Sequence, residues 1–162
     1  MRRVLGGVAA AALVLSAAPA LANGDVVDEP VLLEACEVQA GAERLTADGA
    51  TGTIETPSFL VGDERTVRTF VLDLAGNPVG TTASIDTTMT WLVPANDYDL
   101  EVVAGRTGGT SENYQPFDAA EENVFVAGVG HCQKVEVNAI DFLSPVVVDS
   151  LDLALVVKPK RP

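Results

Sequence analysis

Residues 151–157 read LDLALVV and decide the fold class. Most alternate positions are large and apolar, and successive side chains of a β-strand point to opposite faces. The stretch therefore predicts a strand with one buried face and one exposed face. Similar patterns place further candidate strands at residues 31–38, 67–74, 84–92, 98–104, 123–127 and 134–140. Residues 23–162 show no convincing helical stripe, so we predict an all-β fold in which two antiparallel sheets form a sandwich.

The inward-facing positions of these strands form the expected core. They are Phe70, Leu72, Leu74, Ile85, Thr87, Met89, Trp91, Leu100, Val102, Ala104, Val124, Val126, Val135, Val137, Ala139, Leu151, Leu153, Leu155 and Val157. Trp91 is interpreted as a core anchor, with a sugar-stacking platform as the alternative. Carbohydrate-binding modules generally need two or three exposed flat aromatic side chains, which favours the core role.

Two segments break the alternation and are predicted to be irregular. Residues 39–66 contain several glycines and a proline, with a short strand expected near 53–55 or 58–61. Residues 105–122 are predicted to form a long surface loop. Loops of this length are uncommon without a role.

The N-terminus has the pattern of an export signal. A short basic start is followed by the apolar run Val4–Leu15 and by the small residues Ala20 and Ala22. We predict cleavage after Ala22, which makes residues 1–22 a signal peptide and residues 23–162 a single domain. The apolar run is too short to span a membrane. A freely secreted protein is expected.

The chain is strongly acidic, with a formal net charge of −13. Removal of the signal would take away two of the ten basic residues and leave −15. An acidic surface repels phosphate backbones and anionic lipids, so neither nucleic acid nor a membrane surface is an expected partner.

Two cysteines, Cys36 and Cys132, lie near the two ends of the exported part. Since thiols oxidise outside the cell, we predict one disulfide between them. Closing so long a loop stabilises a fold by roughly 4–5 kcal/mol through the entropy of the unfolded chain. The bond is expected to pin the first strand to the region just before residue 134.

A distinctive passage runs from the strand at 69–74 to residues 89–102, MTWLVPANDYDLEV. It resembles the bacterial pre-peptidase C-terminal domain, in which a "TFxV" strand precedes an "LxW…PxNDxDLxV" strand pair. Residues 121–126 resemble that family's following strand, and the resemblance covers about residues 67–158. It implies a small jelly-roll-like sandwich that assists or targets secreted enzymes, with some members binding calcium, collagen or polysaccharide. One departure is residues 128–132, where the family usually has a "GxY" turn and this chain has a cysteine.

The same passage contains a candidate metal site. Asn96, Asp97 and Asp99 offer three oxygen-bearing side chains within four residues, and Ca²⁺ takes six to eight oxygen ligands. The further ligands would come from Glu112, Asp118, Glu121 or Glu122. The alternative is structural, with Asp97 capping the turn and Asp99 accepting backbone hydrogen bonds. Apart from calcium, no cofactor is expected.

Catalysis is not expected. His131 is the only histidine, and no G-x-S-x-G nucleophile motif is present. A thiol site at Cys132 conflicts with the predicted disulfide. We interpret His131 as a surface or turn residue beside that bond.

The remaining candidates for recognition are Tyr114 and Phe117, because loops on a rigid scaffold commonly carry binding residues. The leading hypothesis is a secreted accessory module that contacts an extracellular protein or polysaccharide through residues 105–122. The alternative is a calcium-stabilised extracellular structural protein. The sequence leaves the oligomeric state open.

Overall fold

The computed structural model describes residues 29–55, 64–111, 120–143 and 149–162, and these ranges contain nine strands and no helix. The strands are β1 (Glu43–Leu45), β2 (Ala50–Glu55), β3 (Glu64–Leu72), β4 (Thr82–Trp91), β5 (Asp97–Ala104), β6 (Thr107–Ser111), β7 (Glu121–Gly130), β8 (Lys134–Leu143) and β9 (Ser150–Lys160). The expected export signal at residues 1–22 lies outside the described residues. No helix in the described part is long and apolar enough to cross a membrane.

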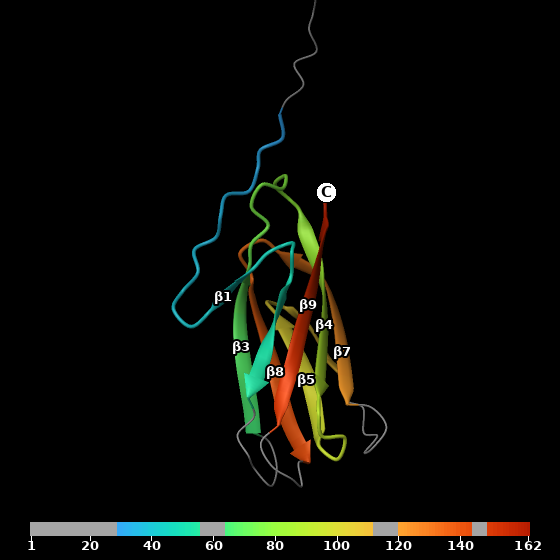
Figure 1. The fold of residues 1–162 in the computed structure, drawn as a ribbon. Helices are drawn as coiled ribbons and strands as arrows, with labels where there is room; N and C mark the ends of the chain where they lie inside the picture. The colour runs from blue at the N-terminus through green and yellow to red at the C-terminus, as the bar shows by residue number, and fades with distance from the viewer. Residues whose placement is uncertain (1–28, 56–63, 112–119, 144–148) are drawn as a thin grey trace, which may run out of the picture.

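The strands form two facing sheets, which confirms the predicted all-β sandwich (Figure 1). One sheet has the order β1-β3-β8-β5-β6 and the other β2-β9-β4-β7. Without β1, this is the jelly-roll arrangement of eight strands, because the chain crosses between sheets at every connection from β2 to β9 except the β5–β6 hairpin. All neighbouring strands are antiparallel apart from β1, which runs parallel to β3.

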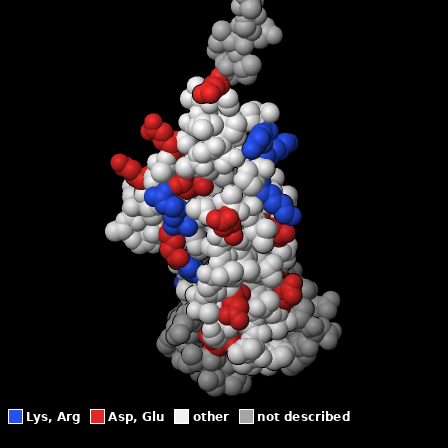
Figure 2. Space-filling model, turned by 45° about the horizontal axis from the view of Figure 1, so that its top comes forward, with Lys and Arg blue, Asp and Glu red and all other residues white. Residues whose placement is uncertain are grey.

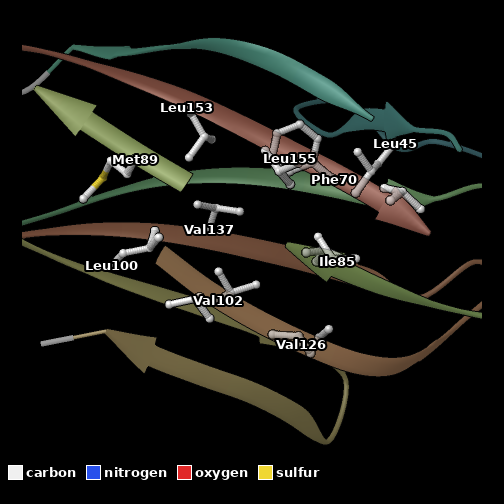
Figure 3. Packing of buried hydrophobic residues seen from close by; sticks show 14 of the residues in the cluster. Leu45, Phe70, Ile85, Met89, Leu100, Val102, Val126, Val137, Leu153 and Leu155 are labelled. Atoms are coloured by element: carbon white, nitrogen blue, oxygen red, sulfur yellow. The ribbon is translucent and has the colours of Figure 1, made fainter. Parts of the chain in front are cut away.

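The core lies between the sheets and follows the predicted alternation. In β4 every second residue from Ala83 to Trp91 is buried, and β9 shows the same period from Leu151 to Val157. All the predicted inward positions are buried. Figure 3 shows side chains from both sheets, such as Met89 and Leu100, converging in this layer. Hydrophobic burial along both sheets is therefore the main stabilising contribution that the structure displays.

The prediction of a strand at residues 31–38 is wrong. This part of the chain runs as an extended strap, defined here as residues 29–42, outside both sheets (blue to teal in Figure 1). Val31 remains 75% exposed, and Leu32 makes a single bridge to Pro78. Backbone hydrogen bonds from Leu33 to the 73–81 loop hold the strap in place. The strand that follows the strap, β1, pairs with the edge of β3.

The two segments predicted to be irregular also contain strands. Residues 39–66 include β1, β2 and the start of β3. Residues 58–61, the other position considered for a short strand, lie outside the described residues. The expected loop at 105–122 begins with β6, which forms a tight hairpin with β5. Gly105 has a φ of +60° in the turn of that hairpin, a conformation that suits glycine. β6 forms because its backbone pairs with β5, although its sequence has no alternating apolar pattern.

Candidate functional site

Several strand ends meet at one end of the sandwich. There, β4 ends at Trp91 and β5 begins at Asp97. The described residues on either side of 112–119 lie at the same end, because Ser111 is opposite Leu100 and Glu121 is opposite Thr90 in the sheets. In addition, the Trp91 backbone N–H donates to the carbonyl oxygen of Ala120 at 3.1 Å. Ser111 and Ala120, the described residues that border 112–119, thus lie toward the end of the sandwich that carries the 92–96 turn.

A buried polar network makes this turn rigid. The indole N–H of Trp91 donates to the backbone oxygen of Asn96 at 3.1 Å, and the Trp91 and Tyr98 rings meet edge to face at a centroid distance of 5.4 Å. The Asn96 side-chain amide donates to the Tyr98 hydroxyl oxygen at 3.1 Å. Trp91 therefore has the expected role of a core anchor, and the residues that carry the family resemblance stabilise a turn.

Asp149 completes this network, and the sequence did not single it out. Its buried carboxylate accepts hydrogen bonds from the backbone N–H groups of Leu92 at 3.4 Å, Val93 at 3.2 Å and Ser150 at 2.9 Å, and from the Asn96 amide at 3.1 Å. A carboxylate satisfied by several N–H donors is well suited to a buried position. Asp149 lies 53 positions from Asn96 in the sequence, so no local motif predicts the contact.

The three candidate calcium ligands lie in different environments. Asn96 is 3% exposed and Asp97 is also buried, whereas Asp99 is partly exposed. The Oδ1 atom of Asn96 is buried and has no hydrogen-bond partner. Within the described residues, Asp97 and Asp99 belong to no group of three His, Cys, Asp or Glu side chains close enough to share an ion. Among the described residues, Asn96 Oδ1 is thus a buried acceptor at this end without a hydrogen-bond donor.

Tyr114 and Phe117, the candidate contact residues, lie outside the described residues. The described part of their segment is β6, where an open depression of about 300 Å³ lies over the β5–β6 hairpin. Its lining is Glu101, Val102, Val103, Gly108, Gly109 and Thr110. A Cβ atom on Gly108 would lie 2.8 Å from the Val102 carbonyl oxygen, so the close approach of β6 to β5 favours glycine at this position.

The disulfide between Cys36 and Cys132 is present as predicted, and the described residues contain no free cysteine. It ties the strap, rather than a first strand, to the turn between β7 and β8. His131 lies in that turn, beside the bond. Its Nδ1 accepts a hydrogen bond from the Leu74 backbone N–H at 3.0 Å, and its Nε2 lies 2.8 Å from the Glu34 carbonyl oxygen. These two contacts assign the ring proton to Nε2.

Asp73 and Arg44 extend this second network. Arg44 forms an ion pair with the buried carboxylate of Asp73 and donates to the Cys36 carbonyl oxygen at 2.9 Å. Asp73 also accepts from the Cys36 N–H at 3.4 Å and lies 4.0 Å from His131 Nδ1. The network links the strap to the loop after β3. Within the described residues, Cys36, His131 and Cys132 are the group whose potential ligand atoms lie within 4.8 Å of one another, but the sulfurs are bonded to each other.

The fold and these two networks define a disulfide-bonded jelly-roll sandwich with a rigid turn at one end. No protein-family model and no curated protein matches the sequence. Among solved structures, the chain is similar to the pre-peptidase C-terminal domain of a collagenase from Bacillus anthracis. The identity is 10% and the TM-score is 0.46, and the match covers 74% of this chain and 99% of that domain. The domain type is the one that the sequence resembles, and neither a site residue nor an activity is transferred from it.

Proposed function

We propose that this chain is an exported, non-catalytic accessory module. In this proposal it contacts an extracellular protein or polysaccharide through residues 105–122 and the adjoining strand ends. Recognition by a loop on a rigid sandwich needs a scaffold that holds the two ends of the loop in fixed positions.

The observation that carries the proposal is the anchoring of both borders of the 112–119 segment. Ser111 belongs to the β5–β6 hairpin, and Ala120 accepts a hydrogen bond from Trp91 in the rigid network. The depression beside β6 adds a hollow next to the segment. Tyrosine and phenylalanine supply large contact areas at a low cost in conformational entropy, which supports Tyr114 and Phe117 as contact residues.

Two further properties support an extracellular module. A disulfide persists in an oxidising compartment, and this fold contains one. On the face that Figure 2 shows, acidic and basic side chains are interspersed, without a continuous basic patch. This distribution gives no support to a phosphate-rich partner.

The test is capture by the purified protein of residues 23–162. A panel of insoluble polysaccharides and of immobilised culture-supernatant proteins is incubated with the wild type and with the Tyr114→Ala/Phe117→Ala variant. We expect capture by the wild type and a loss of at least about tenfold in the variant, since aromatic anchors dominate interfaces. The matched control is Phe125→Ala, which removes an exposed aromatic ring from the outer face of the other sheet. Equal loss in both variants, or none in either, contradicts the proposal.

A calcium-stabilised structural protein is the second candidate, and the unpartnered Oδ1 atom of Asn96 favours it. A bound cation beside Asn96, Asp97 and Asp99 would satisfy that oxygen. Thermal unfolding in millimolar Ca²⁺, with Mg²⁺ as the control, tests the idea. The candidate requires a rise in Tm that Asp97→Asn or Asp99→Asn removes. An unchanged Tm in the wild type eliminates it.

A further inference from the structure

We propose that the Cys36–Cys132 disulfide is a thiol-exchange site. In this reaction an external thiolate attacks Cys132, and Cys36 is the leaving group. The ligand class is a small organic thiol, which becomes attached to Cys132 as a mixed disulfide. The inference is independent of the binding function proposed above.

The two sulfur-bearing residues differ in access. Cys132 is exposed, whereas Cys36 is only 4% exposed. An open pocket of about 470 Å³ lies between the strap and the outer face of β3 and β8, and Cys132 forms part of its wall. Access decides which sulfur a thiolate attacks, so the pocket directs the reaction to Cys132.

The pocket has a lining that suits a small thiol with polar groups. Glu37 and Gln39 come from the strap, and Thr69 and Lys134 come from the sheet. Lys134 is paired with Glu136 at 2.6 Å, so the wall carries a positive charge with a neighbouring acceptor. The volume is of the size that small ligands occupy in protein clefts, roughly 300–1,000 Å³.

Cys132 is also held in an unusual backbone conformation. Its φ is +59°, and among the described residues it is the one non-glycine residue with a positive φ. Its N–H donates to the Leu72 carbonyl oxygen at 2.8 Å, which fixes the turn. Backbone strain of this kind is concentrated at functional sites in proteins. Here it occurs at the exposed cysteine of the pair.

The leaving sulfur contacts a polar side chain. Cys36 Sγ lies 3.4 Å from Nδ1 and 3.5 Å from Nε2 of His131, so the sulfur rests against the imidazole between its two nitrogens. An adjacent imidazole stabilises a thiolate, above all once the ring is protonated. The Asp73 carboxylate lies 4.0 Å from Nδ1 and is itself paired with Arg44. A better-stabilised leaving thiolate accelerates exchange.

The step balances as a simple exchange. The thiolate sulfur forms a bond to Cys132 Sγ while the Sγ–Sγ bond breaks, and the electron pair of that bond goes to Cys36 Sγ. The Cys36 thiolate then stays beside His131 or takes a proton from water. A second thiol molecule reverses the attachment, or completes reduction, by attacking the mixed disulfide. The external thiol is the only reductant that the step needs.

Peptide mapping of the wild-type protein tests the direction of attack. The folded protein is incubated with glutathione and then with iodoacetamide, and the modified peptides are identified by mass spectrometry. We expect glutathione on Cys132 and the alkyl group on Cys36, with at least about a tenfold preference over the reverse pattern. The same treatment in guanidinium is the control, in which both sulfurs are open and the preference disappears. No adduct in the folded state, or glutathione mainly on Cys36, overturns the proposal.

The positioning role of His131 requires a second readout. His131→Gln keeps hydrogen-bonding groups but cannot carry the charge, and we expect it to slow mixed-disulfide formation at least about threefold. In Cys132→Ser, which leaves Cys36 as the single thiol, His131 should give a thiolate ultraviolet absorbance at neutral pH that the added His131→Gln change removes. Unchanged exchange kinetics together with an unchanged thiolate absorbance would remove His131 from the account.

Discussion

The carboxylate of Asp149 and the side-chain amide of Asn96 are joined by a 3.1 Å hydrogen bond across 53 positions of sequence. The contact fastens the start of β9 to the turn between β4 and β5, which belong to different sheets. The Asp149 carboxylate also accepts hydrogen bonds from the backbone N–H groups of Leu92, Val93 and Ser150. This end of the sandwich is therefore held by polar contacts as well as by the core.

Replacing Asp149 with asparagine should destabilise the protein. The change removes the negative charge and one acceptor oxygen from a buried site that contains several donors, so we expect a loss of about 1–3 kcal/mol in the free energy of unfolding. Urea denaturation measures it. The control is Asp152→Asn on the exposed face of β9, for which a change within about 0.5 kcal/mol is expected. Equal effects at the two positions would show that Asp149 has no special role.

Thr87→Val should stabilise the protein. Thr87 faces the core of β4, and its hydroxyl oxygen is buried without a hydrogen-bond partner. Valine has a similar shape and removes the unsatisfied group, so we expect a gain of about 1 kcal/mol. Thr88→Val is the matched control, because Thr88 lies on the other face and accepts from Asn123 at 3.0 Å. A lower Tm for Thr87→Val than for Thr88→Val is the contradictory result.

Two glycine-to-alanine substitutions distinguish the stability cost of backbone strain from that of a steric clash. Gly41 and Gly49 have φ values of +87° and +78°, but a Cβ atom on Gly41 would meet no atom within 4 Å, whereas one on Gly49 would lie 2.2 Å from the Leu155 carbonyl oxygen. Gly41→Ala should cost roughly 1–2 kcal/mol from the left-handed conformation alone. Gly49→Ala should cost distinctly more, because β9 is a central strand and cannot move away. Chemical denaturation of both variants decides the point, and equal losses would show that the Gly49 turn relaxes freely.

Removing both cysteines should cost about 4–5 kcal/mol of stability, since the disulfide closes a loop between residues 96 positions apart. The Cys36→Ser/Cys132→Ser variant is preferable to a single change, which would leave a reactive thiol. We expect the variant to keep the β-sheet circular dichroism spectrum at low temperature and to unfold at a much lower urea concentration than the wild type. An unchanged urea midpoint would mean that the strap contributes little to the stability of the fold.

The sequence predicted the parts of the fold in which side chains alternate. β4, β5, β7 and β9 each have a regular inward set, and burial of those sets follows the pattern in the sequence. β6 was not expected, and β2 was expected only as a short strand near 53–55; both have other causes. β6 reads TGGTS and forms because its backbone pairs with β5. A Cβ atom on Gly109 would lie only 3.0 Å from the Val124 side chain, so little space is left there for a side chain. In β2, Gly52 lies against the guanidinium of Arg68 on β3, a contact that no local pattern predicts.

In the strap, by contrast, the sequence pattern predicted a strand that the structure does not contain. Residues 31–38 contain enough apolar side chains to suggest a strand, but Val31 and Leu32 are exposed. In this stretch Cys36 is buried, and Leu33 is partly buried against the core. A strand also needs an unpaired neighbouring edge, and sequence patterns do not reveal which edges are occupied. The disulfide itself was predictable, because an exported chain with two cysteines has one possible pairing.

The candidate site was predictable in part. The 96–99 cluster was recognised from its composition. Its structural alternative concerned Asp97 and Asp99, whereas the contacts that the structure displays in the turn are those of Asn96. Asp149 could not be found from the sequence, because it precedes β9 as an ordinary acidic residue and meets Asn96 only in the fold. The networks around His131 depend in the same way on Asp73 and Arg44, which three separate parts of the chain bring together.

In the proposed function, the jelly roll is a rigid support for a recognition segment that carries Tyr114 and Phe117. Quantitative capture of an extracellular protein or polysaccharide by the wild type, by Tyr114→Ala/Phe117→Ala and by Phe125→Ala, each with its Tm recorded, is the decisive experiment. We expect a capture loss of at least about tenfold in the double variant alone, with three similar Tm values. Undiminished capture by a folded double variant would overturn the proposal.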